Sequence, residues 1–248
     1  MRSTLLLVAI TISTLLQAET FPWRLGVGVI ADQQIYDNYD ASNFPLIVQT
    51  DEVQLLTVPI IGYEAENWSI GTDGANYTLE SGKNSYTLGA DFTGAGVDYA
   101  YQINDFLSVG SGAGITFNGG LGWQVSANST VLSATYGQLF SDPTAYIATA
   151  STGAPIWIKD GQPGFIATLG LTMQSKTHTL ATANAPLNAK QLDPSQLTLS
   201  TGIIHFWELS DQWSYVIIAG YDWLPIDVQA QAKSNGKANL LSFITYRF

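Results

Sequence analysis

Alternation with a period of two residues is the feature that most constrains this chain. Large apolar residues recur at every second position in six segments: 23–31, 95–103, 107–117, 121–127, 165–173 and 213–221. Successive side chains of a β-strand point to opposite faces, so each segment is interpreted as a strand with one large apolar face. The sequence therefore predicts an all-β protein.

The second face of these strands separates two kinds of all-β protein. In 107–117 and 165–173 that face holds mainly Gly, Ser, Thr and Gln. A soluble β-sandwich would expose Lys, Glu and Arg there, whereas small and weakly polar residues fit the inside of a narrow barrel whose large face meets lipid. A membrane barrel is favoured, and a secreted β-sandwich or lectin-like domain is the alternative. Segment 53–61 is apolar on both faces, which suggests packing against an inserted loop.

The composition supports the membrane interpretation. Hydrophobic residues make up 46% of the chain and charged residues only 12%, about half of the ~25% usual in soluble domains. After the N-terminal segment, no run of about 18 apolar residues could form a spanning helix. A closed barrel also satisfies all backbone hydrogen bonds within lipid. We therefore expect a transmembrane antiparallel β-barrel of the outer-membrane type.

The first 18 residues have the features of a secretory signal peptide. Arg2 provides a positive charge, Leu5 to Leu16 form a short apolar stretch, and Ala18 offers a small residue for cleavage. The predicted organisation is a signal peptide over 1–18 and a single outer-membrane β-barrel domain over 19–248. The stretch is short for a spanning anchor helix, which is the alternative.

The alternating segments give a strand count of ten. The predicted strands are 22–31, 52–63, 67–79, 84–103, 107–117, 120–136, 163–175, 197–209, 212–224 and 237–248. A change of face at Thr93-Gly94 predicts a bulge or break within 84–103. Segment 137–162 is ambiguous, and a hairpin there would raise the count to twelve. Either even number leaves both termini on the periplasmic side.

The links between strands alternate between short and long. Aromatic residues flank the tight turns, with Tyr63, Tyr101 and Trp207 before them and Trp68, Phe106 and Trp213 after them. Long polar links run over about 32–52, 175–196 and 224–236. Short periplasmic turns beside an aromatic girdle, with long extracellular loops, are typical of outer-membrane barrels.

The sequence offers little material for catalysis or metal binding. There is no cysteine, which excludes a disulfide scaffold and a cysteine-ligated zinc site. A net charge of −11 argues against nucleic acid as a partner. His178 lies in a predicted polar loop, and His205 is predicted to face the lipid interface. A barrel lipid hydrolase would need a nucleophile near such a base, but Trp207 occupies the position two residues after His205. No catalytic, cofactor-binding or metal residue is assigned.

Charged residues fall in two further groups. Asp37, Asp40, Asp51 and Glu52 share one long loop, where a solvated acidic surface is favoured over binding of divalent cations or contact with lipopolysaccharide. Four charged residues are predicted to face inward: Arg24, Asp91, Asp98 and Asp222. They would line a narrow channel or close it by pairing with one another. In a barrel of about ten strands, a plugged interior is favoured over an open pore.

The C-terminal strand has alternating apolar residues up to its last position. It ends in Phe248, and Tyr246, Ile244 and Leu240 lie on the same face. This pattern resembles the signal that the barrel-assembly machinery of Gram-negative bacteria reads. The strand is also expected to pair with the strand starting near Trp23, which closes the barrel and removes both edges.

Short motifs along the mature chain resemble the family of the MltA-interacting protein and outer-membrane protein V (MipA/OmpV). They are Leu25-Gly26-Val27-Gly28, Val58-Pro59-Ile60-Ile61-Gly62-Tyr63, Trp68-Ser69-Ile70-Gly71, Gly94-Ala95-Gly96-Val97-Asp98-Tyr99, Trp213, and Asp222 through Pro225. The first loop lacks a Tyr-Pro-Gly run, and the Ser-Pro pair expected near the last hairpin is absent.

The resemblance implies a non-enzymatic scaffold in the outer membrane that links a murein transglycosylase to a murein synthase. The other partners expected are outer-membrane lipid, lipopolysaccharide and the barrel-assembly machinery. A narrow channel or uptake barrel is the alternative function, and a barrel lipid hydrolase is a third. No cofactor is expected.

Overall fold

The computed structural model describes residues 23–36, 47–49, 52–72, 74–81, 84–104, 107–124, 131–139, 142–159, 162–182 and 187–248. Within these residues the strands are β1 (Trp23–Gln33), β2 (Ile47–Gln49), β3 (Val53–Glu64), β4 (Trp68–Gly71), β5 (Gly74–Ser81), β6 (Asn84–Asn104), β7 (Leu107–Gln124), β8 (Val131–Leu139), β9 (Tyr146–Lys159), β10 (Gln162–Ser175), β11 (Ser195–Glu208), β12 (Trp213–Trp223) and β13 (Gly236–Arg247). All pairings between them are antiparallel.

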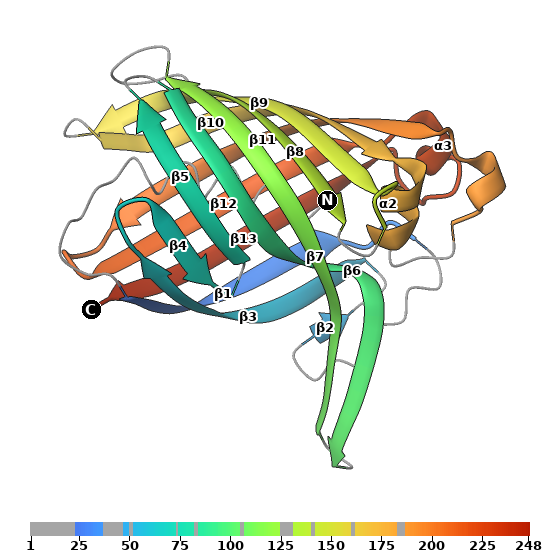
Figure 1. Cartoon of the computed structure of the whole chain (residues 1–248), viewed down its shortest axis with the longest axis horizontal. Helices are drawn as coiled ribbons and strands as arrows, with labels where there is room; N and C mark the ends of the chain where they lie inside the picture. The colour runs from blue at the N-terminus through green and yellow to red at the C-terminus, as the bar shows by residue number, and fades with distance from the viewer. Residues whose placement is uncertain are drawn as a thin grey trace.

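The sheet closes on itself into a barrel (Figure 1). β1 pairs with β13 on one side and with β3 on the other, so twelve of the described strands form a ring and the short β2 adds to β3 outside it. The predicted closure by the C-terminal strand is confirmed, because Leu25 faces Tyr246 and Ala31 faces Leu240 across the seam. Closure leaves the ring without a free sheet edge at this seam.

The count of twelve arises from two regions that differ from the sequence prediction. The predicted strand 67–79 is wrong, because the chain turns at Gly71–Gly74 and forms the short hairpin β4–β5. Gly74 has φ 142°, a conformation that side-chain-bearing residues rarely adopt, which explains how so tight a turn is made. In 137–162, Tyr146–Lys159 is one continuous strand, not a hairpin of its own, and it pairs with β8 and β10.

The predicted boundary between 107–117 and 120–136 is also wrong. β7 runs unbroken from Leu107 to Gln124 through Asn118-Gly119-Gly120. The period-two pattern could not show whether the chain turns here, because Gly and Asn occur both in turns and within strands.

β6 and β7 form a long hairpin that extends beyond the barrel wall. β6 pairs with β5 only as far as Asp91, and β7 pairs with β8 only from Thr116, so the remainder of each strand has the other as its partner. Figure 1 shows this hairpin leaving the wall and extending downward past β2. The predicted interruption at Thr93-Gly94 is confirmed, since the β6–β7 register shifts between Thr93 and Asp98.

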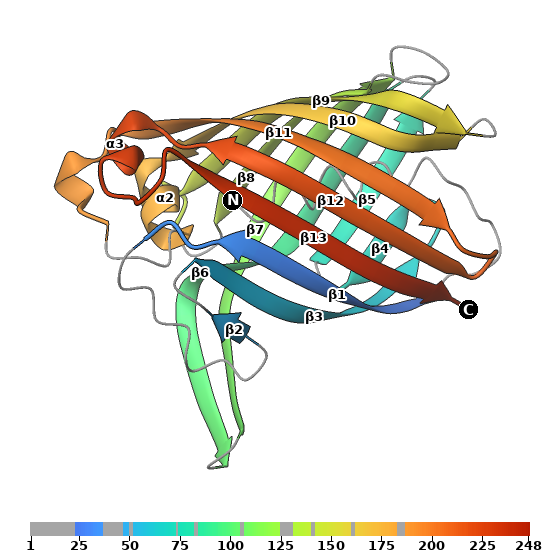
Figure 2. The same ribbon diagram turned by 180° about the vertical axis from the view of Figure 1, so that it is seen from behind.

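The two ends of the barrel differ. One, the turn end, carries the C-terminus and the tight β11–β12 connection; the other, the loop end, carries α2 (Lys176–Thr182), η1 (Ala189–Gln191) and α3 (Ile226–Gln229) (Figure 2). The loop-end segments have a small core of their own, made by Ile35, Leu192, Leu224 and Val228. Tyr36 packs against it, and burial raises the pKa of Tyr36 to about 12. The predicted long links are thus partly folded.

Candidate functional site

The outer surface of the barrel is apolar along its strands. Large exposed side chains alternate with inward ones along the strands, as Leu25, Val27 and Val29 do on β1. On β12, Trp213 and Trp223 are 42% and 41% exposed and mark the two ends of the apolar stretch. The ten steps from Trp213 to Trp223, at ~3.4 Å each and tilted by ~45°, give an apolar band about 24 Å tall, close to the ~25 Å of outer-membrane barrels.

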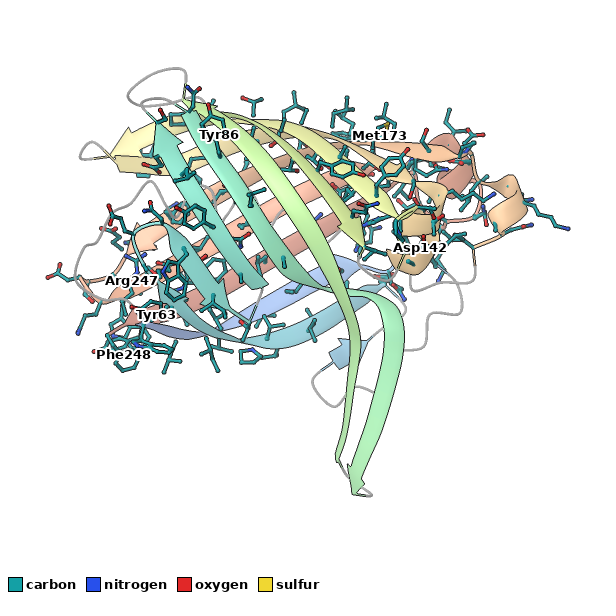
Figure 3. The ribbon with its side chains drawn as sticks, viewed as in Figure 1. Tyr63, Tyr86, Asp142, Met173, Arg247 and Phe248 are labelled. Atoms are coloured by element: carbon teal, nitrogen blue, oxygen red, sulfur yellow. The ribbon has the colours of Figure 1, made fainter. Side chains whose placement is uncertain are left out.

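Aromatic side chains form a girdle at the turn end. Tyr63 lies 5.0 Å from Trp23 and 5.1 Å from Trp68, and Tyr246 lies 5.0 Å from Trp213 and 4.8 Å from Phe248, between ring centroids. Figure 3 shows Tyr63 and Phe248 at this end. The predicted girdle positions Tyr63, Trp68, Trp207 and Trp213 are confirmed as exposed or half-buried aromatics beside turns. The side chains of Tyr101 and Phe106 lie outside the described set.

The fold and this surface define the class of the protein, a closed antiparallel β-barrel of the outer-membrane type. Within the described part of the chain, no helix is long and apolar enough to cross a membrane.

Comparison with known proteins adds no family. No family model matches the chain, and no curated protein matches it. Solved structures that are similar include the translocator domain of autotransporter NalP from Neisseria meningitidis, at 10% identity and TM-score 0.44, covering 96% of this chain and 93% of that one. A porin, KdgM, in complex with disordered oligogalacturonate has 10% identity and TM-score 0.38, covering 90% and 99%. A Pseudomonas aeruginosa FadL homologue has 12% identity and TM-score 0.37, covering 94% and 66%.

The interior of the barrel is the candidate functional site, and its side chains form three layers. At the turn end the layer is charged and polar. Arg24 Nη2 lies 2.9 Å from Glu64 Oε1, and the hydroxyls of Ser214 and Thr245 are 2.7 Å apart. Arg24 faces inward as predicted, and its ion-pair partner is Glu64, a residue at the end of β3 that the sequence analysis did not select.

The middle layer is more apolar than the small and weakly polar interior that the sequence predicts. Ile166, Ile204, Val216 and Ile218 are buried together on β10, β11 and β12, with partly buried Phe206, Leu241 and Phe243 against them. We call strands β10, β11, β12, β13, β1 and β3 the apolar-lined wall. Long-range strand pairing places these residues side by side.

Segment 53–61 belongs to this wall, which explains why both of its faces are apolar. A Cβ atom on Gly28 of β1 would lie 3.2 Å from Val58 Cγ2 and 3.3 Å from Phe243 Cβ. The glycine therefore leaves room for Val58 of β3 and Phe243 of β13 to approach each other across β1. The predicted packing against an inserted loop is replaced by packing within the barrel wall.

Across the interior, the inner faces of β5, β6, β8 and β9 carry pairs of hydroxyl groups. Cross-strand hydroxyl pairs join Thr78 to Thr87 at 3.2 Å and Ser133 to Ser151 at 2.6 Å. We call β5, β6, β8 and β9, on which these residues lie, the hydroxyl-lined wall. Thr149 on β9 continues the row to Thr172 on β10 at 3.1 Å, so the row reaches the loop end of the apolar-lined wall.

The third layer lies at the loop end. Here the strands of the apolar-lined wall carry polar and charged side chains on their inner face. Asp222 accepts hydrogen bonds from the Ser200 hydroxyl and, at 3.2 Å, from Asn239 Nδ2. Lys237 Nζ lies 3.0 Å from Asp32 Oδ2. Asp222 thus faces inward as predicted, and both of these hydrogen-bond partners are neutral groups. The side chains of Asp91 and Asp98 lie outside the described set.

Two glutamines complete this layer, and they are the residues that the sequence analysis missed. Gln174 and Gln196 face each other across β10 and β11 and are only 4% and 3% exposed. The signal available in the sequence was weak, because glutamines at strand ends beside a polar loop are usually solvated.

The two histidines occupy very different places. His205 lies in the girdle, stacked on Phe165 at 4.4 Å, with Nδ1 against the carbonyl oxygen of Gly164. This agrees with the predicted interfacial position. His178 was predicted in a polar loop but is buried in α2, only 2% exposed, and burial lowers its pKa to about 4.

The described residues contain no group of three or more His, Cys, Asp and Glu side chains that could hold a metal ion. Of the predicted acidic loop, Asp37, Asp40 and Asp51 lie outside the described residues, and Glu52 is exposed.

Proposed function

We propose that this protein resides in the outer membrane and, without an enzymatic step, passes small uncharged polar solutes through its barrel. The observation that carries the proposal is the row of hydroxyls along the inner face of the hydroxyl-lined wall, which connects to the polar layer at the loop end. Hydroxyls exchange hydrogen bonds with a polar solute without a charge to attract or repel it.

The apolar middle layer should favour neutral solutes over ions. At that height the interior is lined on β10, β11, β12 and β13 by Ile, Val, Leu and Phe side chains. An ion that leaves water beside such a surface loses hydration energy without compensation, whereas a neutral solute loses far less. We therefore expect low ion conductance together with measurable flux of small neutral solutes. The plugged interior expected from the sequence stays a prediction that the same experiment tests.

The experiment is reconstitution of the purified mature barrel into lipid vesicles. Swelling in isotonic glycerol or glucose measures neutral flux, and planar-bilayer recording in KCl measures conductance. Swelling above that of protein-free vesicles, with small or no conductance steps, is the expected result. Vesicles that do not swell would overturn the proposal. Heat-modifiable mobility on gels and outer-membrane fractionation test the location, because a closed barrel stays folded until boiled.

A second proposal is the scaffold between a murein transglycosylase and a murein synthase. What supports it is the resemblance to the MipA/OmpV family, whose first three motifs here fall on adjacent strands β1, β3 and β4. The described turn-end connections are short, as in 65–67 and 209–212, and offer little area for a partner. Capture of a murein enzyme from envelope extract by wild-type barrel, lost when the 65–67 turn is replaced by glycine and serine, is the expected result.

A further inference from the structure

The β6–β7 hairpin forms a two-stranded ribbon outside the barrel wall. Residues 92–104 of β6 and 107–115 of β7 pair with each other, and within the described residues no strand lies along the other side of either arm. Figures 1 and 2 both show the ribbon projecting away from the barrel. A two-stranded ribbon by itself is only marginally stable, and its open edges are places where another strand can add.

The open edge of β3 is protected against such an addition. Residues 57–60 lie between the parts of β3 that pair with β2 and with β4, and this stretch contains Pro59. The Thr72 N–H donates to the carbonyl oxygen of Ile61 at 2.9 Å, so the backbone groups of Ile61, and of Pro59 two residues earlier, point away from β1. Because proline has no N–H, this edge lacks a donor where a new strand would need one.

Open edges of β9 and β6 carry similar protection. β9 extends past Gly153, its last partner position on β8, and contains Pro155 and Lys159 there. On β6 the register shifts between Thr93 and Asp98, with the extra residues on β6, and Asp98 adds a charge. Proline, charged residues and bulges are the usual means by which a sheet edge is kept from pairing with another chain.

The open edge of β7 has none of these features. Residues 107–115 read Leu-Ser-Val-Gly-Ser-Gly-Ala-Gly-Ile, without proline and without charge, and the extra residues at both register shifts of the hairpin belong to β6. In water such an edge tends to pair with another chain, and in lipid its unpaired backbone groups are strongly unfavourable. An added strand therefore stabilises the β7 edge in either environment.

A second copy of the chain provides a matching strand. Antiparallel pairing of two identical strands is self-complementary about a two-fold axis, so 107–115 of one copy fits 107–115 of the other. The chain has a net charge of −11, which makes most contacts between copies repulsive, and the uncharged β7 edge avoids this repulsion. β3 of the same chain is a poorer partner, because only 57–60 is open and Pro59 cannot donate.

We propose that two copies of this protein associate through the open edges of their β7 strands, which join the two hairpins into one antiparallel sheet. The two-fold axis passes near Ser111, the middle of the open stretch of β7. The inference goes beyond the proposed function, because it concerns a surface outside the barrel interior.

Cysteine cross-linking tests the contact directly, since the chain contains no cysteine of its own. Opposed Cα atoms in an antiparallel pair lie ~4.5–5.5 Å apart, within the ~4.4–6.8 Å that a disulfide spans. The variants on β7 are Val109→Cys, Ser111→Cys and Ala113→Cys, and Thr57→Cys on the protected β3 edge is the control. Oxidation in lipid vesicles, followed by non-reducing gels, should give a covalent dimer with Ser111→Cys and none with Thr57→Cys. A maximum at Val109→Cys or Ala113→Cys also supports the contact and relocates the axis.

A charge on the β7 edge provides a second test. Ser111→Lys places two ammonium groups opposite each other at the axis and should weaken dimerisation about fivefold or more. Ala100→Lys, on β6 of the same hairpin, is the matched control and should leave dimerisation unchanged. Analytical ultracentrifugation of the detergent-purified mature barrel measures both, and heat-modifiable mobility shows that each variant is folded.

Three results would overturn the inference. The first is a wild-type barrel that sediments as a monomer and gives no covalent dimer at any of the three β7 positions. The second is a dimer that Ala100→Lys disrupts and Ser111→Lys does not, which would assign the contact to β6. The third is a disulfide within one chain carrying both Ser111→Cys and Thr57→Cys, formed in place of the dimer, which would show that the hairpin folds back onto β3.

Discussion

The two walls of the barrel share one outer face but have opposite inner ones. Outside, Leu171 of the apolar-lined wall and Leu88 of the hydroxyl-lined wall are both exposed. Inside, Ile204 and Ile218 are fully buried in an apolar cluster, whereas Ser133 and Ser151 share a hydrogen bond. The outer face contacts lipid, which is the same around the whole barrel, so both walls are apolar there. The inner face contacts other side chains of the barrel, so its composition differs from wall to wall.

The largest difference between the walls should come from an inward carboxylate. Ile218→Asp leaves a charge in the apolar cluster without a partner, and we expect a loss of about 3–5 kcal/mol in the free energy of unfolding. Ser133→Asp places the carboxylate beside the Ser151 hydroxyl, which can donate to it, so the loss should stay near 1 kcal/mol. Urea unfolding in detergent, followed by tryptophan fluorescence, measures both. Equal losses would remove the distinction between the walls.

On the outside the walls should behave alike. Leu171→Arg and Leu88→Arg each place a cation toward lipid, and each should cost about 2–4 kcal/mol, more toward mid-membrane. Unfolding from lipid vesicles is the measurement, with the inward change Ser214→Arg as control. A variant that tolerates Arg at Leu88 but not at Leu171 would show that the hydroxyl-lined wall is not in contact with lipid.

Acid should destabilise α2, the helix at the loop end that contains His178. The pKa of His178 is lowered to about 4 by burial, from an ordinary value of 6.5. The unfolded segment therefore binds more protons than the folded one between these values, and stability falls as the pH drops through this window. The full loss is about 3 kcal/mol.

Hydrogen exchange of the α2 amides at pH 7 and pH 5 tests the His178 prediction, with His178→Gln as the comparison. Protection that falls at pH 5 in wild type and not in the variant is expected. The same pH dependence in both proteins would assign the effect to another group.

The smallest expected effect is the loss of one hydrogen bond between hydroxyl groups, which is compared here with the loss of apolar packing. Ser133→Ala removes one hydrogen bond to Ser151 and should cost about 1 kcal/mol. Ile204→Ala in the apolar-lined wall leaves a cavity and should cost about 2–5 kcal/mol. Urea unfolding measures the loss in free energy of unfolding for both variants. A loss in Ser133→Ala as large as that in Ile204→Ala would contradict the difference between the two walls.

Much of the barrel followed from local sequence. The outward faces of β1, β10 and β12, the girdle aromatics Trp68 and Trp213, and the closing pair of β1 and β13 agree with the alternation pattern. Turns within small-residue runs were not predictable in the same way, as Gly71–Gly74 and Asn118-Gly119-Gly120 show. Glycine permits a turn and a continuing strand alike, so neighbours along the chain cannot decide between them.

The sequence alone determined which side chains meet lipid, because that contact is a property of each strand by itself and appears as a period of two. The tertiary structure decided what the inward side chains meet. Gln174 and Gln196 are separated by the whole α2 and η1 segment, and Val58 and Phe243 come from opposite ends of the chain. Their proximity depends on strand register and ring closure, which bring distant residues together and leave no local pattern.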